Sequence, residues 1–302
     1  MPRVAAVQAL PAFLDLQGTL SKLESWTERA AKEGARVVAF PETWIPGYPA
    51  WLDSSPEAAL WGHPGAKTLF ARLMDNSVEV PGPAADRIAK AARTHKITLV
   101  IGVHERAGRT LYNTILTFGS DGSLLNRHRK LMPTYSERLV WGLGDAKGLR
   151  VVPTDAGRIG GLVCWEHWMP LARQVLYDAG EEIHVALWPG LQEMHQVASR
   201  HYAFEGRCFV IAVAGLLRVR DMPPELPLAP QYQTAPDDLL IKGGSAIIAP
   251  NGRYLAGPVF DEEALVVADC DLAEITKEAM TLDVSGHYSR PDLFEFRLRS
   301  ND

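Results

Sequence analysis

The chain has 302 residues, of which 47% are hydrophobic and 22% are charged. This composition is typical of a globular protein with a large buried core, and it excludes a disordered, fibrous or disulfide-dominated chain. The net charge is −5, from 31 basic and 36 acidic residues, and no run of like charges forms a basic patch. We therefore expect no nucleic-acid partner.

The cysteines and the apolar runs indicate the cellular compartment in which the protein acts. Cys164, Cys208 and Cys270 are far apart, form no C-x-x-C motif and, being odd in number, cannot all pair within one chain. Such usage is typical of a reducing compartment. The N-terminus shows no signal peptide, and the longest apolar run, at 208–217, is roughly half the ~20 residues needed to cross a bilayer. We predict a cytoplasmic protein without a membrane partner.

Short apolar runs alternate with amphipathic stretches from the N-terminus onward, which predicts an α/β fold. A strand at 4–10 precedes a helix at 20–31, where apolar residues recur at helical spacing, and a strand at 36–40 follows. A second helix at 83–95, with a proline in its first turn, precedes a strand at 97–103. The β-α-β order thus occurs twice.

The rest of the chain favours hairpins as well as helices. Strands at 111–118 and 124–125 flank a Ser-Asp-Gly turn, and similar pairs flank turns at 155–157 and 251–252. The remaining predicted helices and strands are 171–179, 183–187, 195–204 and 208–217. Crossovers combined with hairpins predict mixed sheets, and the lack of a linker or repeat favours one domain over residues 1–302.

Cys164 is a candidate nucleophile because of its place at the end of an apolar run, Ile-Gly-Gly-Leu-Val. A strand that ends at a cysteine and turns into a helix puts the sulfur at the carboxyl edge of a sheet. Backbone N–H groups there favour a thiolate and could bind an oxyanion. The alternative is a cysteine buried as a small hydrophobic residue, and Cys208 and Cys270 fit that alternative better.

A thiol with a pKa of about 8.5 needs a base or a cation beside it to react at neutral pH. The sequence does not support a histidine base of the papain type, because the local motif that surrounds the cysteine in that family is missing. Two other strand ends carry ionisable residues, Glu42 and Lys130. Aromatic residues and prolines near Glu42 predict a concave, buried site that would raise its pKa. Glu42 could instead cap a helix, and Lys130 could belong to a solvated basic strip.

Three segments together resemble the nitrilase branch of the carbon–nitrogen hydrolase superfamily, whose catalytic triad is Glu-Lys-Cys in this order. They are Phe-Pro-Glu-Thr-Trp-Ile-Pro-Gly-Tyr-Pro at 40–49, His-Arg-Lys-Leu-Met-Pro-Thr at 128–134 and Cys-Trp-Glu-His at 164–167. The resemblance covers nearly the whole chain, through further segments at 137–142, 188–190, 205–210 and 286–292.

The resemblance implies a four-layer α-β-β-α sandwich in which two mixed sheets pack face to face. Family members pair through their outer helices, so it also implies a homodimer or a larger homo-oligomer. The C-terminal tail, residues 283–302, is then expected at a subunit interface. Many nitrilases continue with a longer tail than this chain has, so we expect a dimer rather than a filament.

The resemblance also implies roles for individual residues. Glu42 would take the thiol proton as Cys164 attacks a nitrile carbon, and water would then convert the thioimidate through an acyl thioester to a carboxylic acid and ammonia. Lys130 would stay cationic and stabilise developing charge, together with the backbone N–H of Trp165. Glu137 resembles an additional carboxylate near the triad that steers water or orients Lys130, although it could instead form a surface ion pair.

Candidates for the substrate pocket are aromatic or hydroxyl side chains near these motifs, namely Tyr48, Thr134, Trp141, Trp165 and Trp188. The three tryptophans could equally belong to the core. His195 and His201 are six residues apart and no H-E-x-x-H or calcium-loop motif occurs, so we expect no metal. Because no Walker or G-x-G-x-x-G sequence follows a strand, we expect no nucleotide cofactor.

Three other functions compete with an organic-nitrile hydrolase. An amidase or N-carbamoyl hydrolase of the same superfamily would share the thioester chemistry, and a cyanide dihydratase would share the nitrilase motifs. The sequence motifs at 43–49 and 164–167 favour a nitrilase and a small-molecule nitrile substrate. A non-catalytic scaffold would keep the sandwich, but the intact Glu42, Lys130 and Cys164 argue against it.

Overall fold

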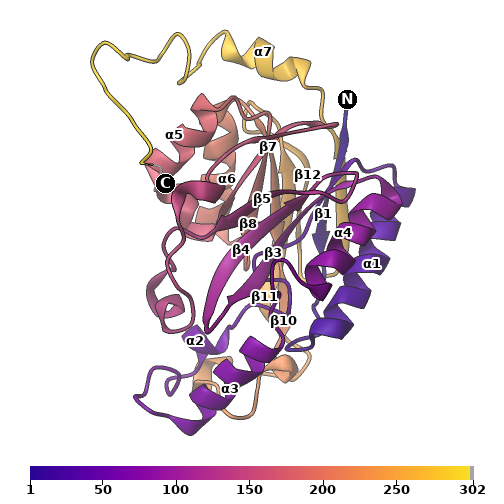
Figure 1. Ribbon diagram of the computed structural model, residues 1–302, viewed down its shortest axis with the longest axis vertical. Coiled ribbons are helices and arrows are strands. Elements are labelled where there is room, and N and C mark those ends of the chain that lie inside the picture. The colour runs from indigo at the N-terminus through magenta and orange to yellow at the C-terminus, as the bar shows by residue number, and fades with distance from the viewer. Residues whose placement is uncertain (300–302) are drawn as a thin grey trace.

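A computed structural model describes residues 1–299 and arranges them as two sheets with helices outside (Figure 1). The first sheet has six strands in the order β13-β1-β2-β3-β4-β5. Their bounds are Arg3–Gln8 (β1), Val37–Ala39 (β2), Thr98–Ala107 (β3), Thr110–Phe118 (β4), Leu124–Arg129 (β5) and Ala264–Asp269 (β13). The second sheet has seven strands in the order β10-β11-β9-β8-β7-β6, with β12 paired to β11. Their bounds are Val152–Thr154 (β6), Gly157–Val163 (β7), Ile183–Trp188 (β8), Phe209–Ala214 (β9), Leu216–Arg218 (β10), Leu239–Ile248 (β11) and Tyr254–Phe260 (β12).

Both sheets are mixed, and the connections explain why. Strands joined through helices run parallel, as in β1-β2-β3 and β7-β8-β9. Strands joined by short turns run antiparallel, as in β3-β4-β5 and β6-β7. A parallel pair needs a long crossover, whereas a hairpin needs only a few residues. The mixed sheets expected from the sequence are confirmed.

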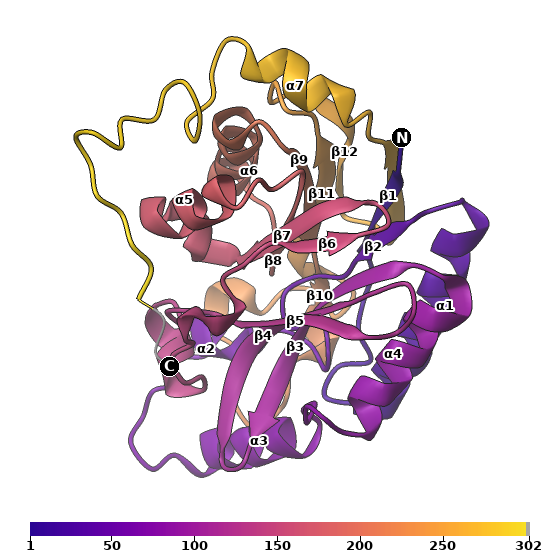
Figure 2. The same ribbon diagram turned by 45° about the horizontal axis from the view of Figure 1, so that its top comes forward.

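The side chains of β1 alternate between the two faces of the first sheet, and each face packs into a different core. Val4 and Ala6 join the core between the two sheets, whereas Ala5 and Val7 join the core under the outer helices, because successive strand residues point to opposite faces. Those helices are α1, Leu16–Lys32, and α4, Pro83–His95, which lie side by side in Figure 2.

Helices α5, Pro170–Asp178, and α6, Glu193–Gly206, lie on the opposite side of the molecule (Figures 1 and 2). Tyr202 and Ala203 of α6 are fully buried in the same core as β8 and β9. The layers therefore run helices, sheet, sheet, helices. This is the four-layer α-β-β-α sandwich that the sequence predicted.

Two differences from the predicted elements have clear causes. The apolar run at 208–217 forms two strands, β9 and β10, because Gly215 turns away and donates its N–H to the carbonyl of Pro189. Helix α3, Pro64–Asp75, was not predicted, since it buries only Leu69 and Leu73 of its residues. The remaining helices are short, namely Trp51–Ser54 (α2) and Ala273–Ala279 (α7).

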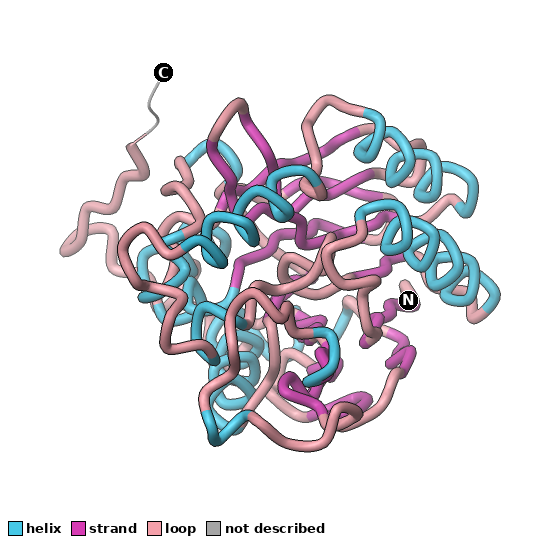
Figure 3. Tube along the Cα trace, turned by 90° about the horizontal axis from the view of Figure 1, so that it is seen from below, coloured by secondary structure: helices cyan, strands magenta, loops and turns pink. Residues whose placement is uncertain are grey.

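The C-terminal tail leaves the sandwich after α7 and runs down the side of the molecule on which α5 lies (Figures 1 and 2). Figure 3 shows this tail projecting from the rest of the chain. Ser285 lies at its start and accepts a hydrogen bond from Gln174 of α5 at 3.4 Å. Further along, Leu293 and Phe294 are exposed. The last three of the predicted interface residues 283–302 lie outside the described residues. No helix in the range 1–299 combines the length and apolar character that a bilayer span requires.

Gly102 of β3 allows the segment that follows β2 to pack closely against β3. A Cβ at this position would lie 2.3 Å from the carbonyl oxygen of Pro41 and 2.7 Å from the Cα of Glu42. Both contacts are with backbone, so no side chain can move aside. The glycine therefore fixes how close the segment that carries Glu42 lies to the first sheet.

We expect Gly102→Ala to lower the free energy of unfolding by about 1–3 kcal/mol, because the close contact forces the backbone to shift. Urea denaturation measures this change. The control is Gly108→Ala, where no atom lies within 4 Å of the new Cβ and the left-handed backbone alone costs about 1 kcal/mol. Equal losses in the two variants would contradict the close-packing argument.

Candidate active site

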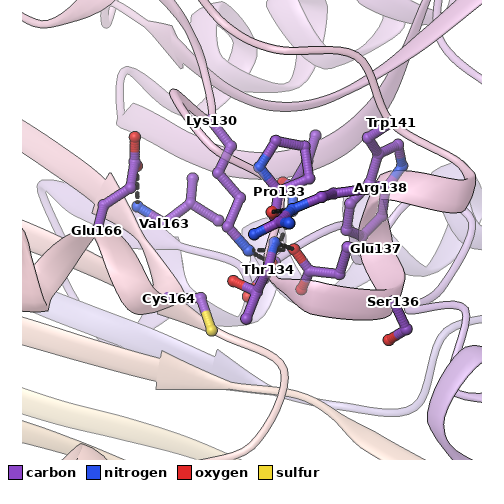
Figure 4. A network of polar contacts seen from close by, with 12 residues as sticks. Lys130, Pro133, Thr134, Ser136, Glu137, Arg138, Trp141, Val163, Cys164 and Glu166 are labelled. Carbon is purple, nitrogen blue, oxygen red and sulfur yellow. Dashed lines mark hydrogen bonds and ion pairs between the residues drawn. The ribbon is translucent and has the colours of Figure 1, made fainter.

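Three strand ends from the two sheets meet at one site. Glu42 follows β2, Lys130 follows β5, and Cys164 follows β7. Their exposed fractions are only 2%, 1% and 4%. Figure 4 shows Lys130 and Glu137 pointing toward each other beside Thr134, with the Cys164 side chain extending toward the same region. The residues that the sequence predicted as a triad are thus brought together.

Lys130 lies between two carboxylates. Its Nζ donates hydrogen bonds to Oε2 of Glu137 at 2.6 Å and to Oε1 of Glu42 at 3.1 Å. Oε1 of Glu42 also accepts a hydrogen bond from Nδ2 of Asn113 at 2.6 Å. The second oxygen, Oε2, is buried and has no hydrogen-bond partner among the described residues. Glu42 therefore keeps one oxygen available for a proton.

The surroundings of Glu42 bring its pKa close to neutrality. Burial raises the pKa, the positive charge of Lys130 opposes this effect, and the negative charge of Glu137 adds to it. The result is a pKa of about 7. A carboxyl group with such a pKa can both accept and return a proton at neutral pH.

Opposite effects act on Lys130 and Cys164. Burial disfavours the charged form of Lys130, but the charges of Glu42, Cys164 and Glu137 raise its pKa overall, so it stays cationic. Burial and Glu42 raise the pKa of Cys164 well above its ordinary value, whereas Lys130 and the backbone N–H of Trp165 lower it. The resting sulfur is therefore a thiol that needs a base to become a nucleophile.

Glu137 is the third residue of the short 3₁₀ helix Tyr135–Leu139 and is almost fully buried. Besides Lys130, it accepts hydrogen bonds from the hydroxyl of Tyr48 at 3.0 Å and from the backbone N–H of Thr134 at 2.6 Å. The sequence left open an ion pair with Arg138, but the Arg138 guanidinium donates instead to a carbonyl oxygen. Glu137 is thus placed to orient Lys130.

A cavity of about 790 Å³ opens beside Cys164. Of the predicted pocket residues, Tyr48, Thr134 and Trp165 line it, and the hydroxyl oxygen of Thr134 has no hydrogen-bond partner in the described part of the chain. Other lining residues come from loops and helix ends around the site and include Met132, Pro133, Trp168, Met169, Pro189 and His195. Residues 1–299 contain no group of three or more His, Cys, Asp or Glu side chains arranged to hold a metal ion.

Trp141 and Trp188, which the sequence also proposed for the pocket, are buried and do not line this cavity. The indole of Trp141 donates to Nδ1 of His104 at 3.0 Å, so Nε2 of His104 carries the proton toward the carbonyl of Gly47. The carbonyl of Trp188 faces the backbone N–H of Glu42 at 3.4 Å. Both tryptophans therefore pack beneath the site and do not line the cavity. Aromatic character alone does not distinguish these two positions.

Glu166 is a residue that the sequence analysis missed. Its carboxylate accepts hydrogen bonds from the backbone N–H of Val163 at 2.7 Å, from that of Leu131 at 2.8 Å, and from Nε2 of His128 at 3.0 Å. Val163 precedes Cys164 and Leu131 follows Lys130, so one carboxylate ties together the segments that carry both. The only sequence signal was an acidic residue two positions after the cysteine.

Comparison with known proteins identifies the family of this chain. The family model described as carbon-nitrogen hydrolase matches residues 3–279. A bifunctional nitrilase/nitrile hydratase of Lupinus angustifolius is 42% identical over 99% of this chain and 86% of its own length. A nitrilase of Paraburkholderia phymatum is 40% identical over 98% and 86%, and an aliphatic nitrilase of Sinorhizobium fredii is 39% identical over 97% and 94%. The chain therefore belongs to the carbon–nitrogen hydrolase family.

Within that family, these relatives confirm the resemblance to nitrilases that the sequence predicted. Solved structures confirm the fold. A CN-hydrolase superfamily protein of Xanthomonas campestris superposes with a TM-score of 0.73 at 19% identity, covering 99% of each chain. Nit3 of Saccharomyces cerevisiae superposes with a TM-score of 0.71 at 18% identity, covering 95% of this chain and 96% of its own.

We expect Glu166→Gln to lower the free energy of unfolding by about 1–3 kcal/mol, because its amide NH₂ would face a buried backbone N–H and leave it unpaired. Burial disfavours the Glu166 carboxylate, but His128 and the two backbone N–H groups hold its pKa below the ordinary 4.5. Its stabilisation is therefore present at neutral pH and is lost as the pH falls below that value. Urea denaturation at a series of pH values measures both effects.

The control is Glu24→Gln, which removes a half-exposed ion pair with Arg87 and should change the stability by less than about 1 kcal/mol. A Glu166→Gln protein as stable as this control at neutral pH would contradict the proposed role of Glu166.

Proposed function

We propose that the protein is a nitrilase that hydrolyses a small organic nitrile to the carboxylic acid and ammonia. The observation that carries this proposal is that the buried Glu42–Lys130 pair lies close to Cys164, which lines the cavity, in a chain whose relatives are named nitrilases. A nitrile carbon is electrophilic, but its nitrogen leaves only after repeated protonation. The reaction therefore needs a strong nucleophile and a group that transfers protons more than once.

The first half of the reaction forms a thioimidate. The Cys164 thiol gives its proton to the free Oε2 of Glu42, and Sγ forms a bond to the nitrile carbon. Glu42 then passes the proton to the nitrile nitrogen. A first water adds to the same carbon, and Glu42 transfers the two protons of this water, one after the other, to the nitrogen. The C–N bond then breaks as ammonia leaves. The acyl thioester on Cys164 remains.

The second half releases the acid. Glu42 takes a proton from a second water, whose oxygen attacks the thioester carbon. The C–S bond breaks, the carboxylic acid is released and the thiol regains its proton. Lys130 stays cationic throughout and donates hydrogen bonds to the negative charge that develops on nitrogen or oxygen, with the backbone N–H of Trp165 as a second donor. Glu137 keeps the Lys130 ammonium in place, and Tyr48 and Thr134 contact the substrate.

Assembly and location follow from the same proposal. The tail residues Leu293, Phe294 and Leu298 expose apolar side chains, which supports a homodimer or larger homo-oligomer with the tail at a subunit interface of a single-domain subunit. All three cysteines are free and buried, which agrees with action in the cytoplasm.

We expect the protein to release ammonia from members of a panel of short aliphatic, aromatic and arylacetic nitriles plus cyanide, with little release from the matched amides. Acid and amide products are both quantified, because the Lupinus relative is named a nitrile hydratase as well as a nitrilase. Cys164→Ala should lower turnover at least about 1000-fold through loss of the nucleophile. The matched control, Cys208→Ala, changes a buried cysteine outside the cavity and should keep turnover. Activity on amides alone would identify an amidase instead.

We expect kcat/KM to rise as the pH increases through about 7, because only the carboxylate form of Glu42 accepts the thiol proton. Initial rates over a pH series, with a nitrile that does not ionise, measure this dependence. Glu42→Gln should lower kcat/KM at least about 100-fold and remove the rise. A wild-type profile that is flat across neutral pH would show that Glu42 is not the base.

A further inference from the structure

Four buried polar side chains lie behind Cys164, and the mechanism above uses none of them. His167 lies in the 3₁₀ helix Cys164–Trp168, and Tyr202 lies in α6. Glu181 lies two residues before β8, and His184 is the second residue of that strand. Each is at most 5% exposed, and none lines the cavity. Burying so many polar groups is costly unless each is hydrogen-bonded, so their pairing is informative.

The four side chains form one continuous chain of hydrogen bonds that ends at the nucleophile. Nδ1 of His167 is 2.6 Å from the carbonyl oxygen of Cys164, and Nε2 of His167 is 2.9 Å from Nε2 of His184. Nδ1 of His184 is 2.8 Å from Oε1 of Glu181. The hydroxyl of Tyr202 donates to Oε2 of Glu181 at 2.7 Å.

The proton positions along this series of hydrogen bonds can be assigned by starting from the Cys164 carbonyl. The carbonyl oxygen of Cys164 can only accept, so Nδ1 of His167 carries a proton and donates it. Nε2 of a neutral His167 is then an acceptor, and Nε2 of His184 must donate. Nδ1 of His184 is in turn an acceptor, and Glu181 must supply the proton as a carboxylic acid. Every bond therefore points toward Cys164.

The environment favours this neutral arrangement. Burial lowers the pKa of both histidines well below the ordinary value, and it raises the pKa of Glu181 to about 8. Ring stacking fixes both imidazoles, since His167 lies against Trp188 with ring centres 4.6 Å apart and His184 lies against Tyr202 at 3.6 Å. The rings cannot turn without breaking these contacts.

The hydrogen bond from His167 to the Cys164 carbonyl also fixes the direction of the Trp165 N–H. The carbonyl of Cys164 and the N–H of Trp165 belong to one rigid, planar peptide unit and point in opposite directions. Holding the carbonyl toward His167 therefore aims the N–H at the other side, where it lowers the pKa of the Cys164 thiol. Cys164 also has a φ of +51°, a backbone conformation that a non-glycine residue adopts only when its surroundings hold it there.

We propose that Glu181, His184 and His167 form a buried relay that positions the Trp165 N–H and the Cys164 backbone for catalysis. These three are positioning residues, because none reaches the substrate cavity. The inference rests on the proposed function, in which that N–H stabilises the reacting centre. It assigns Glu181 as the proton donor that fixes both histidine tautomers from a distance.

Two variants of His167 test the first link. In His167→Asn, the amide nitrogen replaces Nδ1 as the donor to Cys164, whereas His167→Leu has no donor. With a nitrile that the wild type hydrolyses, we expect His167→Leu to lower kcat about 100-fold, the usual effect of losing one anion-hole donor, with little change in KM. His167→Asn should recover most of this loss. His201→Leu, which changes an exposed histidine on α6, is the control for substitution alone.

Two variants of Glu181 test the far end. Glu181→Gln still offers a donor to His184 and an acceptor to Tyr202, so its kcat should stay close to the wild-type value. Glu181→Leu removes both bonds and should lower kcat about 10-fold or more. Equal losses in Glu181→Gln and Glu181→Leu, or equal losses in His167→Asn and His167→Leu, would overturn the relay.

Two measurements do not depend on turnover. In ¹⁵N-histidine NMR, we expect His167 to be protonated at Nδ1 and His184 at Nε2, with the signals assigned from the His167→Asn spectrum. The alkylation rate of Cys164 by iodoacetamide, followed by peptide mass spectrometry, should fall in His167→Leu and recover in His167→Asn. The opposite tautomers, or an unchanged alkylation rate in a folded His167→Leu protein, would refute the relay. If the wild type hydrolysed no nitrile, only the proposed function would fail, because both measurements would still report on the relay.

Discussion

The site depends on one electrostatic constraint, the burial of a single ammonium group between two carboxyl groups. Lys130 must be paired once it leaves water, and Glu137 and Glu42 provide that pairing. Two carboxylates around one cation leave an excess of negative charge, and burial makes this excess more costly. Glu42 relieves it with a pKa near neutrality. The interaction that allows Lys130 to be buried thus also produces a base of suitable strength.

This arrangement exists only where the two sheets meet. Glu42 and Lys130 come from strands of the first sheet and Cys164 from a strand of the second, so neither sheet alone contains the site. Glu166 joins the segments from the two sheets, and Gly102 allows the Glu42 segment to lie close to β3. Packing between the sheets and assembly of the catalytic groups are therefore the same event.

The sequence could predict that Glu42, Lys130 and Cys164 come together because each follows a strand within a recognisable motif, and the alternating pattern was enough to predict mixed sheets. It could not predict the relay. Glu181 and His184 lie in no motif that the sequence analysis recognised, and His184 reaches His167 because β7 and β8 pair in parallel with Gly160 opposite His184. Register of this kind depends on tertiary packing. The same limit applies to Trp141 and Trp188, whose burial also depends on tertiary packing.

The unpartnered oxygen of Glu42 has a consequence for the order of events. Its other oxygen is occupied by Asn113 and Lys130, so Oε2 alone is open. A single open atom can hold only one proton at a time. In the proposed mechanism, each water therefore gives up a proton only after the previous one has left Oε2, so the proton transfers through Glu42 occur one after another.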